Sequence, residues 1–149
     1  MRHAGASRWR DFAGGRSCAR LALAELGVPR APIMKGDKGE PLWPEGVVGS
    51  ITHCRGYCAA AVARQHSLGA LGIDAEPHEA LPTEVHALIL GPEERAWVRD
   101  APRGIHWQQV IFSIKESIYK AVFPALSCWI DFHDVCIVRG AELGMLVRY

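Results

Sequence analysis

The apolar pattern between Trp107 and Val122 is the feature that most constrains the fold of this 149-residue chain. Apolar residues recur there at three- and four-residue spacing, which predicts a helix with one buried face. Because proline lacks a backbone N–H, we expect the helix to end near Pro124. The apolar stripe consists of Trp107, Val110, Ile111, Ile114, Ile118, Ala121 and Val122.

The other face of this predicted helix carries charge. Glu116 and Lys120 are four residues apart and therefore neighbours across one turn, with Lys115 beside them. A carboxylate and two ammonium groups could take part in phosphate chemistry. Two plainer interpretations stay open: a surface ion pair worth about 0.3 kcal/mol, or a capping box in which Glu116 reaches back to Ser113. The apolar period continues upstream of Ser113, which argues against the cap.

Composition restricts the class of protein. With 49% apolar residues, the chain can form one domain with a core, or two small lobes sharing one. No run approaches the roughly 20 apolar residues of a membrane span, and the N-terminus lacks the apolar centre of a signal peptide, so we expect a cytoplasmic protein. The five cysteines contain no Cys-x-x-Cys pair, which fits free thiols. A zinc site at His53, Cys54 and Cys58 is disfavoured, because no second ligand pair would complete it.

Charge is distributed unevenly along the chain. Residues 1–40 hold eight Lys and Arg against four Asp and Glu, whereas the remainder holds nine against twelve. A basic end facing an acidic end suits a polyanionic ligand and a bridging cation, although a solvated basic helix gives the same count.

The basic end begins with a predicted helix over residues 12–26, in which Leu21, Ala22 and Leu26 face inward. Arg16 and Arg20 lie one turn apart on it and would form a fork for phosphate oxygens, unless both are solvated. Residues 27–44 then read as a connecting loop. Glycines in this loop let the backbone approach a ligand, and its lysines add positive charge, although a surface turn would look similar.

Short strands are predicted over residues 47–53, 57–63 and 68–75, as a meander of three. His53, at the end of the first strand, is the polar group expected to meet a ligand; the alternative is a histidine whose hydrogen bonds are made by the backbone.

Alternation along the third predicted strand puts Asp74 and Glu76 on one face, and Pro77 ends the strand. Paired carboxylates suit Mg²⁺, while an exposed acidic strand end is the alternative.

Five short motifs occur in order over residues 15–123. They are Gly15-Arg16; Gly39-Glu40-Pro41 with Trp43-Pro44; Ser50-Ile51-Thr52-His53; Gly72-Ile73-Asp74-Ala75-Glu76; and the run from Phe112 to Lys120. Each motif is weak alone, but the ordered series resembles the Sfp-type phosphopantetheinyl transferases. It is most similar to their enterobactin-synthetase component D branch, as is the run from Trp129 to Asp134.

This resemblance implies an activity. Family members transfer 4'-phosphopantetheine from coenzyme A to a serine of an acyl or peptidyl carrier protein, with Mg²⁺, and release 3',5'-ADP. The resemblance implies that Asp74, Glu76 and Glu116 are the Mg²⁺ ligands, that Glu116 is also the base, and that Lys120 and Lys115 lie near the pyrophosphate. The implied coenzyme-binding residues are Arg16, Arg20, Lys35, Lys38, Gly39, Glu40, Pro41, Thr52 and His53.

The resemblance also implies an α+β fold of two similar lobes related by a pseudo-twofold axis, here about residues 1–72 and 73–149, with the coenzyme between them. Residues 81–90 and 92–99 read as short helices, and residues 135–138 and 143–149 as strands. Carrier docking in the family makes Val85, Leu88, Ile89 and Leu90 candidates for that contact, with ordinary core as the alternative. We expect a monomer without nucleic-acid or membrane partners.

The chain also departs from the family pattern. The segment that usually precedes the arginine helix is missing, and the sequence ends at Tyr149 inside a predicted strand, so we expect a fold truncated at both ends. Ala75 is not a metal-ligand type. Two other functions stay open: a different Mg²⁺-dependent phosphotransfer enzyme such as a phosphoesterase, and a non-catalytic coenzyme A-binding protein.

Overall fold

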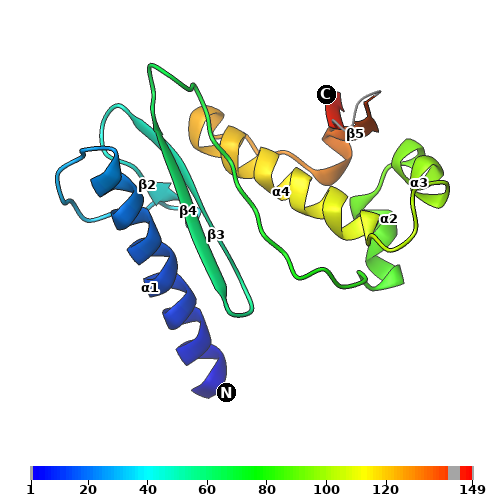
Figure 1. Ribbon diagram of the computed structural model, residues 1–149, viewed down its shortest axis with the longest axis horizontal. Helices are drawn as coiled ribbons and strands as arrows, with labels where there is room; N and C mark the ends of the chain where they lie inside the picture. The colour runs from blue at the N-terminus through cyan, green and yellow to red at the C-terminus, as the bar shows by residue number, and fades with distance from the viewer. Residues whose placement is uncertain (1, 141–144, 149) are drawn as a thin grey trace.

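The computed structural model describes residues 2–140 and 145–148 of the chain. Helices and antiparallel hairpins follow one another along the chain, which confirms the predicted α+β class (Figure 1). The elements are α1 (Arg2–Glu25), β1 (Met34–Lys35), β2 (Pro41–Leu42), β3 (Val47–Cys54), β4 (Tyr57–Arg64), the 3₁₀ turn η1 (Thr83–Val85), α2 (His86–Ile89), α3 (Pro92–Arg99), α4 (Trp107–Leu126), the 3₁₀ turn η2 (Phe132–Asp134), β5 (Cys136–Arg139) and β6 (Met145–Arg148).

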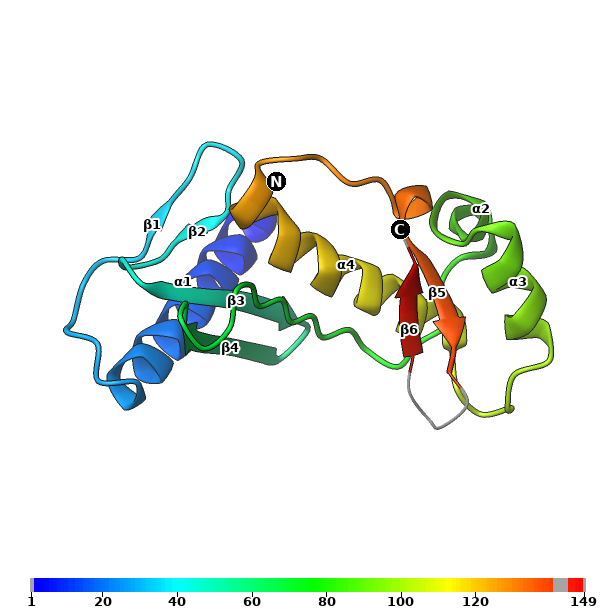
Figure 2. The ribbon, with the colours of Figure 1, turned by 90° about the horizontal axis from the view of Figure 1, so that it is seen from above.

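Helix α1 lies along the β3–β4 hairpin in both views of the ribbon (Figures 1 and 2). It starts earlier than the sequence predicts and ends as expected, just before Gly27, which has a left-handed φ of 71°. Ala19 and Leu23 are buried against the hairpin. The expectation that Leu21 faces inward is wrong, because Leu21 is 68% exposed. Two residues correspond to about 200° around a helix, so Leu21 lies opposite its buried neighbours.

The β3–β4 hairpin has the predicted strands, paired from Val47↔Arg64 to Cys54↔Tyr57. The predicted third strand is wrong, because residues 65–82 form no strand. Instead this segment follows β3 through side-chain hydrogen bonds: Ser50 Oγ donates to the Ile73 carbonyl at 3.4 Å, and the Ala75 N–H donates to Thr52 Oγ1 at 2.9 Å.

Gly72 explains why the segment lies close to α4 as well as to β3. A Cβ atom built on Gly72 would lie 1.8 Å from the Ser117 carbonyl oxygen of α4. The backbone of the segment therefore touches the backbone of α4 directly, and a side chain at this position would separate them.

Helix α4 runs through the second half of the described fold, between the β3–β4 hairpin and helices α2 and α3 (Figure 2). It ends two residues beyond Pro124, slightly later than predicted, where Ser127 adopts a left-handed φ of 50°. Its buried Ile111 packs with Ile89, Leu90, Val135 and Ile137 in a second core, separate from the core under α1.

The smaller elements of this half differ little from the sequence prediction. Residues 81–90 contain η1 and α2 in place of one helix, and α3 has the predicted bounds. Strands β5 and β6 pair with Ile137 opposite Val147; predicted strand residues 143, 144 and 149 lie outside the described part of the chain. Among the suggested docking residues, Ile89 and Leu90 belong to the core, whereas Leu88 is 65% exposed.

The five cysteines are free. Across the described residues, every helix is too short or too polar to cross a membrane. The division into lobes at about residue 72 stays a prediction, although the two cores lie on either side of it in the sequence.

Candidate active site

Asp74 lies at the centre of the candidate site, with its side chain only 4% exposed. One carboxylate oxygen, Oδ1, accepts hydrogen bonds from Thr52 Oγ1 at 3.2 Å and from Lys120 Nζ at 2.5 Å. The other, Oδ2, accepts one from Ser113 Oγ at 2.9 Å. Strand β3 and helix α4 therefore hold this carboxylate from two sides, and charge-assisted hydrogen bonds of this kind are the stronger ones.

Glu76 and Glu116 add negative charge near Asp74, with Glu76 lining the same groove as Asp74. Gln109 Nε2 donates to Glu76 Oε2 at 3.4 Å. Burial raises the pKa of Glu76, the charge of Asp74 raises it further, and Lys120 opposes both effects. Burial also raises the pKa of Glu116, where Lys120 opposes the shift and Asp74 adds to it. The three carboxylates thus repel one another within one partly desolvated site.

The chemistry of this site fits Mg²⁺. Carboxylate oxygens are its preferred protein ligands, and a divalent cation would relieve the repulsion that raises the pKa values of Glu76 and Glu116. In the described residues, no three His, Cys, Asp or Glu side chains are already arranged as a metal cluster, and Lys120 is paired with Asp74. Metal binding by Asp74 would therefore require the Lys120 ammonium to move away from it.

Helix α4 divides its polar residues between two faces. Ser113 and Lys120 point to Asp74. The structure does not bring Lys115 to this group, because its side chain is buried on the core side of the helix. The capping-box alternative is excluded, since α4 begins at Trp107 and Ser113 bonds to Asp74. The surface-pair alternative also fails as stated, because the ion pair of Lys120 is with Asp74.

A cavity of about 440 Å³, here called the basic cavity, opens beside this site. Lys120 lines it and also reaches Asp74, so the cavity and the carboxylates are adjacent. Thr52 lies outside it, in support of Asp74, and Arg20 is also outside, exposed and bonded to Ser17. The sequence-predicted residues that line the basic cavity are Arg16, Lys35, Lys38, Gly39, Glu40, Pro41 and His53.

Arg16 has a structural role as well as a place in the cavity wall. Its Nε donates to the Ile33 carbonyl at 3.1 Å, and its guanidinium lies 4.7 Å from the ring centre of Phe12. Burial lowers the pKa of Arg16, and the nearby charge of Arg20 lowers it further. Arg16 therefore fixes the loop after α1 while it presents positive charge to the cavity.

Glu40 shapes the turn that carries the two lysines. Its Oε2 accepts the Lys38 N–H at 3.0 Å, and its carbonyl accepts the Gly36 N–H at 2.8 Å. A Cβ on Gly36 would lie 2.1 Å from Glu40 Oε1, so a side chain there would displace the Glu40 carboxylate from its present place. Lys35 and Lys38 reach the cavity from the hairpin that Glu40 holds.

Aromatic residues of the cavity wall were missed by the sequence argument. Tyr119 and Phe123 stack at 5.3 Å on the face of α4 that lines the basic cavity. Their four-residue spacing places them on one face of the helix, which was the available signal. The basic cavity therefore combines cationic groups with an aromatic wall.

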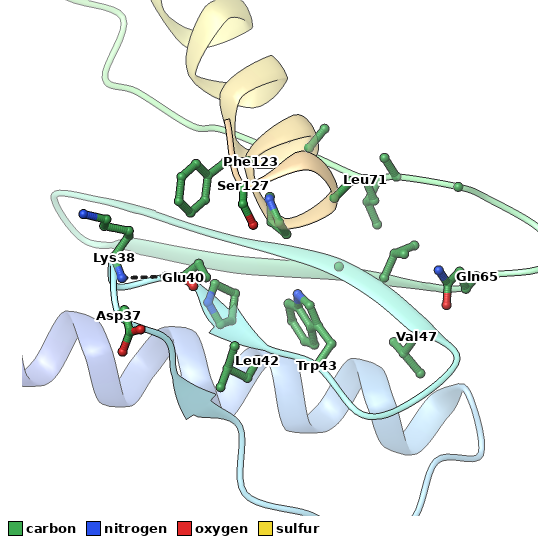
Figure 3. A pocket seen from close by; sticks show the side chains of 18 residues that line it. Asp37, Lys38, Glu40, Leu42, Trp43, Val47, Gln65, Leu71, Phe123 and Ser127 are labelled. Atoms are coloured by element: carbon green, nitrogen blue, oxygen red, sulfur yellow. Dashed lines mark hydrogen bonds between the residues drawn. The ribbon is translucent and has the colours of Figure 1, made fainter. Parts of the chain in front are cut away.

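One further hollow adjoins the basic cavity, and another is linked to it through the Lys120–Asp74 pair. One, of about 610 Å³, shares Lys38, Glu40 and Phe123 with it and is lined by Trp43 and Leu71 (Figure 3). The other is an open groove of about 410 Å³ beside Asp74, Glu76, Gln109 and Ser113. A phosphorylated ligand in the basic cavity and a second reactant in the groove would meet at Asp74 and Lys120.

Two family models match the sequence. The one described as 4'-phosphopantetheinyl transferase N-terminal domain matches residues 1–63, and the one described as 4'-phosphopantetheinyl transferase superfamily matches residues 70–148. The chain belongs to the 4'-phosphopantetheinyl transferase superfamily. The family resemblance inferred from the motifs is therefore confirmed.

Curated relatives agree with this assignment to the phosphopantetheinyl transferases. The chain is 51% identical to 4'-phosphopantetheinyl transferase PptT of Mycobacterium tuberculosis, over 89% of this chain and 59% of that protein. It is 48% identical to 4'-phosphopantetheinyl transferase Npt of Nocardia iowensis, over 92% and 62%. Enterobactin synthase component D of Salmonella typhimurium is 38% identical, over 81% and 51%. The chain thus spans about half to three fifths of the length of these relatives.

Proposed function

We propose that this protein transfers 4'-phosphopantetheine from coenzyme A to a serine of an acyl or peptidyl carrier protein, in a Mg²⁺-dependent reaction that releases 3',5'-ADP. One observation carries the proposal: Lys120 lines the basic cavity and bonds to the buried Asp74 at 2.5 Å. A pyrophosphate held by the cavity would lie next to the acidic cluster, as displacement at phosphorus requires.

The basic cavity supports coenzyme A as the donor substrate. Arg16, Lys35, Lys38 and His53 converge on it from α1, the β1–β2 hairpin and β3. Coenzyme A carries a pyrophosphate and a 3'-phosphate, which need several cationic groups at once. The aromatic wall of Tyr119 and Phe123 offers a partner for the less polar parts of the coenzyme.

The chemical step can be written with the residues of this chain. The serine oxygen of the carrier attacks the β-phosphorus of coenzyme A, the bond from that phosphorus to the bridging oxygen breaks, and 3',5'-ADP leaves. The serine proton passes to the Glu116 carboxylate, which acts as the general base. Lys120 is placed to neutralise the charge that develops on the phosphates.

Asp74, Glu76 and Glu116 are the residues proposed to hold Mg²⁺, which when bound supplies positive charge to the pyrophosphate. Thr52 and Ser113 orient Asp74 for this role. The acceptor serine would enter through the groove beside Asp74 and Glu76, and the exposed Leu88 is the proposed carrier contact.

The wider setting is also proposed. Two separate hydrophobic cores support one domain of two lobes, about residues 1–72 and 73–149. Five free cysteines support a reducing compartment, the cytoplasm, where the protein would act as a monomer.

The test is to incubate the protein with coenzyme A, Mg²⁺ and an apo carrier protein, and to weigh the carrier by mass spectrometry. Transfer predicts a carrier heavier by one phosphopantetheine, with one 3',5'-ADP released for each modified carrier. Cleavage of coenzyme A without a gain in carrier mass would identify a phosphoesterase instead. Binding of coenzyme A without either product would identify a non-catalytic binder. The matched control is Ser17→Ala, an exposed change on α1 outside the cavity, which should leave transfer unchanged.

A further inference from the structure

A buried ion pair joins α4 to α3 on the side of α4 that faces away from the candidate site. Lys115 Nζ lies 2.7 Å from Glu94 Oε2, and the two side chains are 2% and 0% exposed. Lysine and glutamate are almost never fully buried unless they are paired, so this pair needs a specific explanation.

All three donors of Lys115 and both carboxylate oxygens of Glu94 are hydrogen-bonded. Besides Glu94, the Lys115 ammonium donates to the Ile89 carbonyl at 2.9 Å and to the Phe132 carbonyl at 2.7 Å, which accounts for its three donors. The Glu94 carboxylate in turn accepts the Gly91 N–H at 2.7 Å and the Ile137 N–H at 2.8 Å. The network therefore ties α4 to α2, α3, η2 and β5 at one point.

The position of Lys115 on α4 connects this network to the site. At about 100° per residue, Lys115 lies roughly 140° around the helix from Lys120 and roughly 160° from Ser113. These are the two α4 side chains that bond to Asp74. If α4 rotated about its axis, the core contacts of Lys115 and the Asp74 contacts would change together.

An apolar stripe alone does not fix the rotation of a helix about its axis tightly, because aliphatic side chains can repack with small energy differences. A buried hydrogen-bond network that uses all three donors of a lysine is more directional, and buried polar groups of this kind are known to fix register in helical packing. Lys115 takes the place of an aliphatic residue in the buried stripe of α4, between Ile111 and Ile118.

We propose that Lys115 and Glu94 are positioning residues, which set the rotation of α4 so that Ser113 and Lys120 bond to Asp74. The inference rests on the proposed function for the use of that site, but the geometry it concerns is independent of any ligand. Lys115 then acts through α4 and touches neither coenzyme nor acceptor.

The test is a double-mutant cycle on the Lys120–Asp74 contact, measured by chemical unfolding without ligands. The cycle consists of Lys120→Met, Asp74→Asn and their combination. It is measured in the wild-type protein and in a Lys115→Met/Glu94→Gln background. This background removes both buried charges together and keeps a similar side-chain volume. The matched background is Ile111→Val, a change in the same buried stripe that leaves the ion pair intact. We expect the Lys120–Asp74 coupling to fall by at least half without the pair and to persist in the Ile111→Val background.

Equal coupling in the wild-type and pair-less proteins would overturn the proposal, as would absence of coupling in the wild type. A merely stabilising pair would lower the stability of all four proteins of a cycle equally and leave the coupling unchanged. If the double variant does not unfold cooperatively, Glu94→Gln alone serves as the background, since Lys115 keeps its two carbonyl acceptors. Because the readout uses no coenzyme, loss of coupling supports the positioning role even if no transfer to a carrier is found.

Discussion

Gly72 gives the most direct test of how the site is assembled. A Cβ atom at this position would lie 1.8 Å from the Ser117 carbonyl oxygen and 2.8 Å from the Ala121 nitrogen, both in the backbone of α4. No side-chain rotation can relieve these contacts. The Gly72→Ala variant must therefore separate residues 71–74 from α4 by about 1.6 Å, the difference between 1.8 Å and an ordinary contact of 3.4 Å.

This displacement is large compared with the contacts of Asp74, two residues further along the chain. A shift of that size would carry the Ser113–Asp74 hydrogen bond, now 2.9 Å, beyond the 3.5 Å limit of such bonds. Overpacking of this kind costs typically 1–3 kcal/mol, and we expect the upper end because the clashing atoms are backbone. Gly72→Ala should thus lower the free energy of unfolding by about 3 kcal/mol and weaken Mg²⁺ binding.

The chain offers a matched control in Gly69→Ala. Gly69 belongs to the same connecting segment, but a Cβ built there has no heavy atom within 4 Å. We expect its free energy of unfolding to stay within about 0.5 kcal/mol of the wild type, with unchanged Mg²⁺ affinity. Urea unfolding and titration calorimetry measure the two quantities. Gly72→Ala behaving like Gly69→Ala in both would refute the proposed contact between the segment and α4.

Three further outcomes are expected. Glu116→Gln should reduce carrier modification about 100-fold or more, since the amide cannot take the serine proton, yet leave coenzyme A binding near normal; full activity would remove Glu116 as the base. Lys35→Met should weaken coenzyme A binding about fivefold and less at high salt, whereas Arg20→Met, outside the cavity, should not; equal losses would contradict the assignment. The raised pKa values of Glu76 and Glu116 let the folded state keep protons that the unfolded chain has lost. The metal-free wild type should therefore gain stability relative to Glu76→Gln/Glu116→Gln as the pH falls from neutral towards 4.5, and it should lose Mg²⁺ affinity over the same range. Parallel stability profiles of the two proteins would argue against the shifts.

Local periodicity could predict which side chains of one segment lie on the same side, and part of the site depends only on that. Alternation placed Asp74 and Glu76 together, and both line the same groove even though their segment is not a strand. Extended backbone alternates its side chains whether or not it pairs in a sheet. Helical spacing likewise placed Glu116 and Lys120 on one side of α4, where Lys120 reaches Asp74.

Arg16 and Arg20 show why spacing alone was insufficient for the coenzyme residues. One turn of helix separates them, yet Arg16 is buried beside the loop after α1 and Arg20 is exposed. The difference follows from Ala19, three residues after Arg16, which is buried against the hairpin and marks the inner side of α1. The side that a helix buries depends on the element it packs against, which for α1 is the β3–β4 hairpin. The spacing of residues within α1 does not contain that information.

The family resemblance implies a place near the pyrophosphate for Lys115, but the helical position of Lys115 indicates the opposite side of α4. It lies four residues after Ile111, within the apolar stripe, where a charged side chain requires a buried partner. Glu94 carries the complementary signal, since Trp97 and Val98, three and four residues later, pack on the same core. A lysine in one apolar stripe and a glutamate at the edge of another are therefore expected to form a buried ion pair. The structure places Lys115 Nζ 2.7 Å from Glu94 Oε2.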